Sequence, residues 1–160
     1  MRTLVIIRHA KAESGSVMND FNRELSDKGK KDAAKMASIL NKQNVRPQLL
    51  ITSSAKRAYQ TCAIFAAQFT IHKKEIIKKN LLYDEYSIND LKQILVESAQ
   101  TRGTVFVFGH NPTLAHIISD LTTNFDGHFP TSSVAVIDFD IDKWDELDRT
   151  KGEMRLFETP

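Results

Sequence analysis

The chain has 160 residues, the usual length of one domain, and we assign residues 1–160 to a single domain. Hydrophobic residues make up 41% and charged residues 26%, which argues against disorder, and the formal net charge of +2 argues against nucleic acid as a partner. The single cysteine, Cys62, excludes an internal disulfide, and no apolar run approaches the ~20 residues of a membrane span. We therefore expect a soluble cytoplasmic protein without a membrane partner.

Strand and helix patterns alternate along the chain. Residues 4–7 form a continuous apolar run rich in β-branched side chains, which predicts a strand buried on both faces. Apolar residues then repeat at helical spacing over 27–41, after the helix cap Ser26. Further strands are expected at 49–51, 75–78, 104–108, 133–139 and 153–157, and further helices from 56 onward, at 88–99 and from 112 onward.

This order predicts an α/β fold, a three-layer α/β/α sandwich around a mostly parallel sheet. The last two strands have no helix between them, so we expect them to pair antiparallel at an edge. Pro112 is expected at the first position of its helix, capped by Asn111.

Three polar motifs follow predicted strands. They are Arg8-His9, the stretch 53–57 that contains Lys56 and Arg57, and Gly109-His110-Asn111-Pro112. Open α/β sheets bind ligands beyond the carboxyl ends of their strands, so we expect all three motifs to face one crevice.

The expected contents of this crevice suit a phosphoryl group. The guanidinium groups of Arg8 and Arg57 can grip phosphate oxygens in pairs, and two helix N-termini add backbone donors. Lys56 is interpreted as a solvated surface residue. A neutral histidine is a competent nucleophile, and neighbouring arginines disfavour its charged form.

Other chemistries lack their signatures. The sequence contains no H-E-x-x-H metal motif, no glycine-rich phosphate loop and no G-x-S-x-G elbow, so we expect neither a metal nor an organic cofactor. Glu85 and Asp84 are the most interesting acids, and the alternative for both is a solvated turn.

Together the three motifs resemble those of the histidine phosphatase superfamily, the fold of the cofactor-dependent phosphoglycerate mutases. Arg8-His9 resembles its Arg-His-Gly signature, residues 52–61 its second motif, and Gly109-His110 its late motif. The segments 23–29, 82–83, 109–114, 130–131 and the C-terminal stretch to 160 are similar to the small SixA-type phosphohistidine phosphatases. Ala10 stands where the family has Gly, and Gly15 where it has Asn.

The resemblance implies His9 as the nucleophile, with Arg8, Arg57 and His110 completing the catalytic pocket. His110 and Asn111 would also bind the substrate phosphate. Glu85 is a rough candidate for a proton donor, with Asp84 and Asp20 behind it.

Two arguments favour phosphohistidine as the substrate. Imidazole, with a pKa near 6.5, can leave with little help from an acid, whereas an alkoxide needs one. Because no segment remains for a sizeable cap domain, the crevice should admit a phosphohistidine on another protein, and the resemblance implies a histidine phosphotransfer domain of a signalling relay. The alternatives are a phosphomonoesterase for small esters, with Glu85 or Asp84 as the acid, and a catalytically silent phosphoprotein-binding module.

Overall fold

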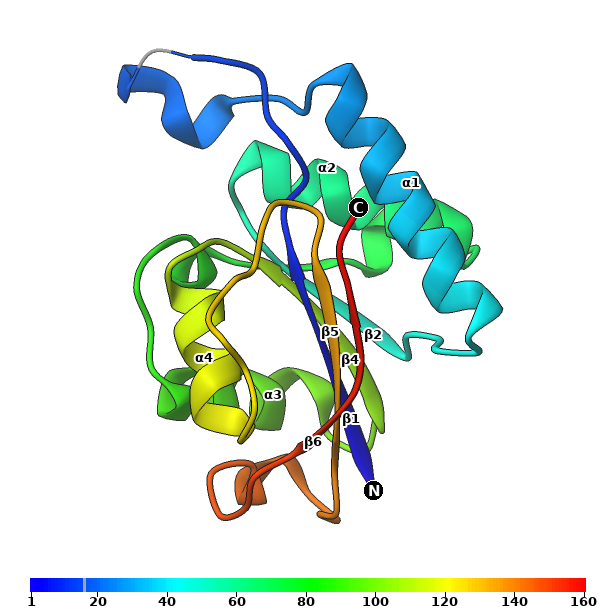
Figure 1. The fold of residues 1–160 in the computed structure, drawn as a ribbon, viewed down its shortest axis with the longest axis vertical. Coiled ribbons are helices and arrows are strands. Elements are labelled where there is room, and N and C mark those ends of the chain that lie inside the picture. Colours follow the sequence, from blue (N-terminus) through cyan, green and yellow to red (C-terminus); the bar gives the residue numbers. More distant parts are fainter. Residues whose placement is uncertain (16) are drawn as a thin grey trace.

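A computed structural model describes residues 1–15 and 17–160. Within these residues, six strands form one sheet in the order β3-β2-β4-β1-β5-β6 (Figure 1). They are β1 (Arg2–Arg8), β2 (Leu49–Ser53), β3 (Ile77–Lys79), β4 (Thr104–Gly109), β5 (Val134–Phe139) and β6 (Glu153–Glu158). The pairs β1–β4, β2–β4 and β2–β3 are parallel, while β5 runs antiparallel to both β1 and β6. The mostly parallel sheet and its antiparallel last pair are thus confirmed.

Helices cover both faces of this sheet. They are α1 (Asp27–Lys42), α2 (Lys56–Gln68), α3 (Ile88–Ala99) and α4 (Thr113–Leu121). In Figure 1, α1 and α2 lie over one face and α3 and α4 over the other. Short 3₁₀ turns occupy η1 (Val17–Asn22), η2 (Lys73–Glu75), η3 (Asn80–Tyr83) and η4 (Trp144–Glu146). The result is the predicted α/β/α sandwich, and no large cap domain is inserted among the residues that the structure describes.

The buried strand β1 divides the core into two parts. Leu4 and Ile6 pack into the cluster beneath α3 and α4, whereas Val5 and Ile7 pack into the cluster beneath α1 and α2. All four side chains are fully buried. Alternation along a strand sends successive side chains to opposite faces, so a strand covered on both sides must be apolar at every position. This is why the run at 4–7 is continuous.

The caps of two helices contrast. Ser26 caps α1 as expected, since its side-chain oxygen accepts a hydrogen bond from the Gly29 amide at 3.0 Å. The predicted cap at α4 is wrong: the helix begins at Thr113, Pro112 is its cap residue, and no side chain caps it. The Asn111 amide group instead donates to the carbonyl of Phe129 at 2.8 Å, which takes it away from the helix.

The sheet register brings the three sequence motifs to one edge. Arg8 at the end of β1 pairs with Gly109 at the end of β4, and Thr52 near the end of β2 pairs with Phe108. Because these strands are parallel, the loops that follow them leave the sheet side by side. No helix in the described ranges is long and apolar enough to cross a membrane.

Candidate active site

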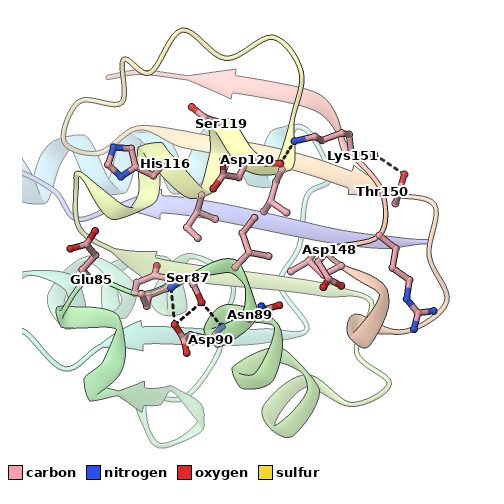
Figure 2. Close-up of a pocket in the computed structure, with 16 residues that line it drawn as sticks. Glu85, Ser87, Asn89, Asp90, His116, Ser119, Asp120, Asp148, Thr150 and Lys151 are labelled. Carbon is pink, nitrogen blue, oxygen red and sulfur yellow. Dashed lines mark hydrogen bonds between the residues drawn. The ribbon is translucent and has the colours of Figure 1, made fainter.

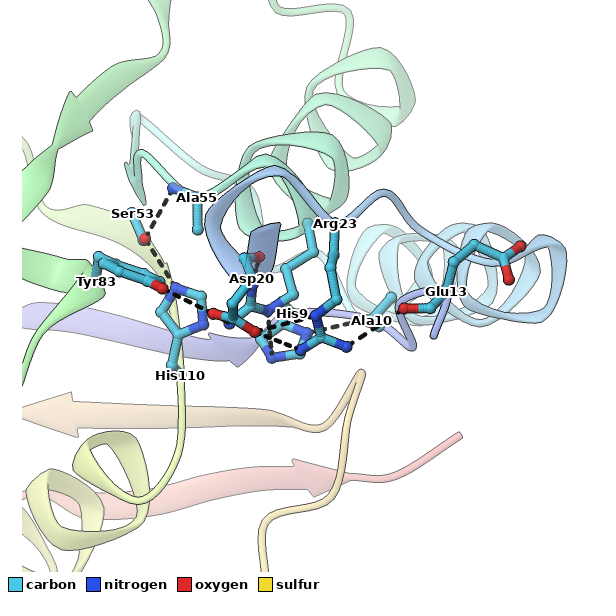
Figure 3. A network of polar contacts seen from close by, with 10 residues as sticks. His9, Ala10, Glu13, Asp20, Arg23, Ser53, Ala55, Tyr83 and His110 are labelled. Carbon is cyan, nitrogen blue, oxygen red and sulfur yellow. Dashed lines mark hydrogen bonds and ion pairs between the residues drawn. The ribbon is translucent and has the colours of Figure 1, made fainter. Parts of the chain in front are cut away.

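Two imidazole rings lie together at this edge. The rings of His9 and His110 have their centroids 5.1 Å apart, tilted by 49° (Figure 3). Their exposed fractions are only 7% and 8%. Burial lowers the pKa of His9 to about 4 and that of His110 to about 3, and the charge of Arg57 acts in the same direction on both. Both rings are therefore neutral at physiological pH.

The contacts of His9 fix the tautomer of its ring. Its Nδ1 lies 2.8 Å from the carbonyl oxygen of Ala10. A carbonyl only accepts, so Nδ1 carries the proton and Nε2 carries the lone pair. The Nε group of Arg57 points at this lone pair from 3.4 Å. His9 is thus fixed in the tautomer that a nucleophile attacking through Nε2 requires.

Two side chains of α2, Thr61 and Gln60, hold the chain between β1 and α1 in place. The Ala10 amide donates to Thr61 Oγ1 at 2.9 Å, and that hydroxyl donates to the Arg57 carbonyl at 2.7 Å. Gln60 Oε1 accepts a hydrogen bond from the Leu25 amide at 2.8 Å. Ala10 itself is fully buried in the core beneath α1 and α2, so a methyl group fits where the family has glycine.

His110 is held from one side only. Its Nε2 lies 2.8 Å from Ser53 Oγ. The Ser53 oxygen accepts a separate hydrogen bond from the Ala55 amide at 3.2 Å. Within the described residues its Nδ1 is buried and has no hydrogen-bond partner. A buried polar atom without a partner is costly, and a hydrogen bond to a ligand would offset this cost.

The two arginines differ in their surroundings. Arg57 is only 6% exposed, and its side chain lies within contact of His9. Arg8 donates through Nη1 to the Phe129 carbonyl at 3.0 Å, while its Nε is buried and unpartnered among residues 1–15 and 17–160. Burial, followed by the charge of Arg57, lowers the pKa of Arg8. Two like charges and two neutral rings together form a site that an anion would stabilise.

The predicted acids are placed differently from one another. Glu85 lines a separate pocket of about 1030 Å³ beside α3 and α4, together with His116 and Asp120, and Figure 2 shows it there. Neither histidine of the crevice lines that pocket. Asp84 is exposed. Asp20, the third candidate, is the acid that the structure brings to Arg57, through an ion pair of 3.1 Å.

Three contributors were not assigned by sequence reasoning. Ser53 orients His110, and Tyr83 places its ring edge-on to His110 with centroids 5.5 Å apart. The Phe129 carbonyl accepts from both Arg8 and Asn111. The position of Ser53 at the end of a strand could have indicated a role in the site. The contact of the Phe129 backbone carbonyl could not have been predicted, because every residue type carries such a carbonyl. Lys56 pairs with Glu24 at 2.8 Å, in keeping with its interpretation as a surface residue.

The fold is that of an α/β protein in which two neutral histidines meet two arginines at the carboxyl ends of parallel strands. Residues 4–86, just over half of the chain, match the sequence profile of the histidine phosphatase superfamily (branch 1). The chain belongs to this superfamily.

Solved structures with this fold include SixA proteins. A candidate SixA phosphohistidine phosphatase from Agrobacterium tumefaciens is 28% identical, with a TM-score of 0.80 over 99% of this chain and 98% of that one. A second from Nakamurella multipartitia is 24% identical, with a TM-score of 0.84 over 99% and 96%. The protein histidine phosphatase SixA, solved with tungstate, is 20% identical, with a TM-score of 0.81 over 97% and 95%.

A curated relative extends beyond this chain. An uncharacterised chloroplastic protein of Arabidopsis thaliana is 30% identical over 118 residues, which cover 69% of this chain and 54% of the relative. The chain therefore spans about half the length of the curated relative that it matches.

Proposed function

We propose that this protein is a phosphatase that removes the phosphoryl group from a phosphohistidine on another protein, through a phosphohistidine intermediate on His9. The observation that carries the proposal is the Nε2 lone pair of His9, a buried ring whose tautomer is fixed by the Ala10 carbonyl and which lies among arginine charges. The SixA proteins whose fold it shares, one of them solved with tungstate, support the same substrate class.

The reaction consists of two displacements at phosphorus. His9 Nε2 forms a bond to phosphorus as the bond to the substrate imidazole breaks. The substrate ring, protonated on its other nitrogen, leaves as neutral imidazole. Water then attacks phosphorus, the bond to His9 breaks, and phosphate carries away the two hydrogens of the water. His9 returns to its neutral form with the proton on Nδ1.

Charge on the equatorial oxygens is stabilised by Arg8, Arg57 and His110 in both steps. We assign to His110 the tautomer in which the Ser53 hydroxyl donates to Nε2 and the ring proton lies on Nδ1, which has no partner among the described residues. That proton is then available to a phosphoryl oxygen. Asn111 remains a predicted phosphate ligand, and here its amide donates to the Phe129 carbonyl.

The position of the acids favours a phosphoramidate over an alkyl ester. An alkoxide needs a proton from a positioned acid, and the predicted donor Glu85 lies in the other pocket. A protonated imidazole needs no such donor. As partner we propose a protein that displays phosphohistidine at its surface, such as a histidine phosphotransfer domain in a cytoplasmic signalling relay.

Covalent trapping tests the proposal. A protein carrying ³²P-phosphohistidine is mixed with the enzyme and quenched within milliseconds, and we expect label that is acid-labile and base-stable on His9. His9→Ala should take up no label. Binding of the phosphoprotein by the wild-type chain without any label would overturn the proposal and favour a silent binding module. Rapid turnover of sugar phosphates with no turnover of the phosphoprotein would favour a phosphomonoesterase.

A further inference from the structure

Asp20 accepts hydrogen bonds from two nitrogen atoms of Arg57, the arginine proposed to bind phosphate. Arg57 Nη1 donates to the backbone carbonyl of Asp20 at 2.7 Å, and Nη2 donates to its carboxylate oxygen Oδ2 at 3.1 Å. Arg57 Nε points at His9. The Nε–Nη2 side of this guanidinium, which can grip two oxygens of a phosphoryl group, is therefore shared by His9 and a carboxylate.

The Asp20 carboxylate is held beside Arg57 by further hydrogen bonds. Tyr83 donates its hydroxyl to Oδ2 at 2.7 Å, and Arg23 reaches Oδ1 through Nε at 3.0 Å and Nη2 at 2.9 Å (Figure 3). The hydrogen bond from Tyr83, the charge of Arg57 and the hydrogen bonds from Arg23 and Arg57 lower the pKa of Asp20 to about 2. The group is thus a permanent anion at physiological pH, and it cannot serve as the missing proton donor.

An anion on these donors competes with the anion of a substrate. A phosphoryl oxygen and a carboxylate oxygen ask for the same N–H groups, and two negative charges in contact repel each other. We propose that Asp20 is a specificity-determining residue, whose carboxylate takes the place of a phosphoryl oxygen on Arg57 in the resting site and must yield it to the substrate. This inference rests on the proposed function, because it assigns Arg57 to phosphate binding.

The exchange requires only a local movement. Arg23 holds Oδ1 without using Arg57, so the carboxylate can release Nη2 and keep its other partner. Asp20 belongs to η1, a surface segment whose neighbouring residue Phe21 is 40% exposed and packs edge-on against Tyr83. A protein substrate can touch this surface and offset the cost of displacing Asp20. Free phosphate and small phosphate esters have no such contacts, so Asp20 disfavours them.

The test is the sign of the change in oxyanion affinity. Calorimetry with tungstate and with inorganic phosphate compares the wild-type chain with Asp20→Asn, which removes the charge and keeps the shape. We expect both anions to bind about tenfold more tightly, since a competing charge in contact is lost. Glu13→Gln is the matched control. It removes a carboxylate from the same loop, and the Glu13 side chain points away from Arg23 in Figure 3. It should change the affinity less than twofold.

Unchanged or weaker binding by Asp20→Asn would overturn the inference and make Asp20 a residue that merely positions Arg57. Asp20→Ala repeats the measurement should the amide variant fail to fold. In kinetics, the ratio of kcat/KM for a phosphohistidine protein to that for free phosphoimidazole should fall about tenfold in Asp20→Asn. Failure of the proposed function is seen separately, as a wild-type chain without label on His9, while the binding measurement still decides the role of Asp20.

Discussion

The site at the strand ends and the pocket beside α3 and α4 both collect titratable side chains, but only the first buries its histidines. In the pocket, Glu85, His116 and Asp120 are exposed to solvent (Figure 2). In the crevice, two histidines are buried against arginines and stay neutral. The comparison teaches that burial beside fixed charges, and not the volume of a cavity, marks the site where chemistry is expected.

The largest effect should come from Arg57. Arg57→Ala removes donors to the phosphoryl group and the contact to His9 Nε2, so we expect kcat/KM for a phosphohistidine protein to fall on the order of 10³-fold. Its sequence neighbour provides the control: Lys56→Ala breaks only an exposed ion pair with Glu24 and should cost less than twofold. Similar losses in both variants would contradict the assignment of Arg57 to the crevice.

A smaller loss should follow removal of the Ser53 hydroxyl. Ser53→Ala leaves Nε2 of His110 without its partner, so the ring no longer has a fixed tautomer, and we expect kcat to fall about tenfold. The measurement is single-turnover labelling of His9, which separates the chemical step from binding. Ser54→Ala, whose hydroxyl contacts Asn80, is the neighbouring control and should label at the wild-type rate.

The neutral rings also make stability depend on pH. The pKa values of His9 and His110 are lowered on folding, so the unfolded chain binds protons first as pH falls below about 6.5. The free energy of unfolding should therefore decrease as the pH falls from 6.5 to about 3, and above pH 6.5 these two groups should not change it. NMR titration of the two side chains, followed with urea unfolding at each pH, measures both effects. A midpoint near 6.5 for either ring would contradict the burial argument.

The smallest effect should come from the other pocket. Glu85→Gln alters a side chain outside the crevice, so we expect less than a twofold change in kcat/KM for a phosphohistidine protein. Assays with an aryl phosphate run alongside. A collapse of ester turnover in this variant would make Glu85 a proton donor after all and favour the phosphomonoesterase alternative.

The sequence was sufficient for the fold and for much of the crevice, because their signals are local. A continuous apolar run, a helical repeat and polar residues at strand ends placed β1, α1 and the motifs around His9 and His110. The contacts of Asp20, Tyr83 and the Phe129 carbonyl depend on segments 37 to 121 residues away from their partners. Local sequence patterns do not predict contacts between segments so far apart in the chain. The predicted cap Asn111 was wrong for the same reason, because its side-chain amide donates to the carbonyl of Phe129.

Thr61 joins the two halves of the proposed machinery. The Thr61 hydroxyl accepts a hydrogen bond from the Ala10 amide beside His9 and donates one to the Arg57 carbonyl. The proposed nucleophile and the proposed phosphate ligand Arg57 are therefore positioned by the same side chain. A shift of the backbone at Arg57 is therefore expected to move the backbone beside His9 as well. A designer who wishes to adapt the proposed reaction to other leaving groups should therefore vary residues around the site and keep the Thr61 hydroxyl.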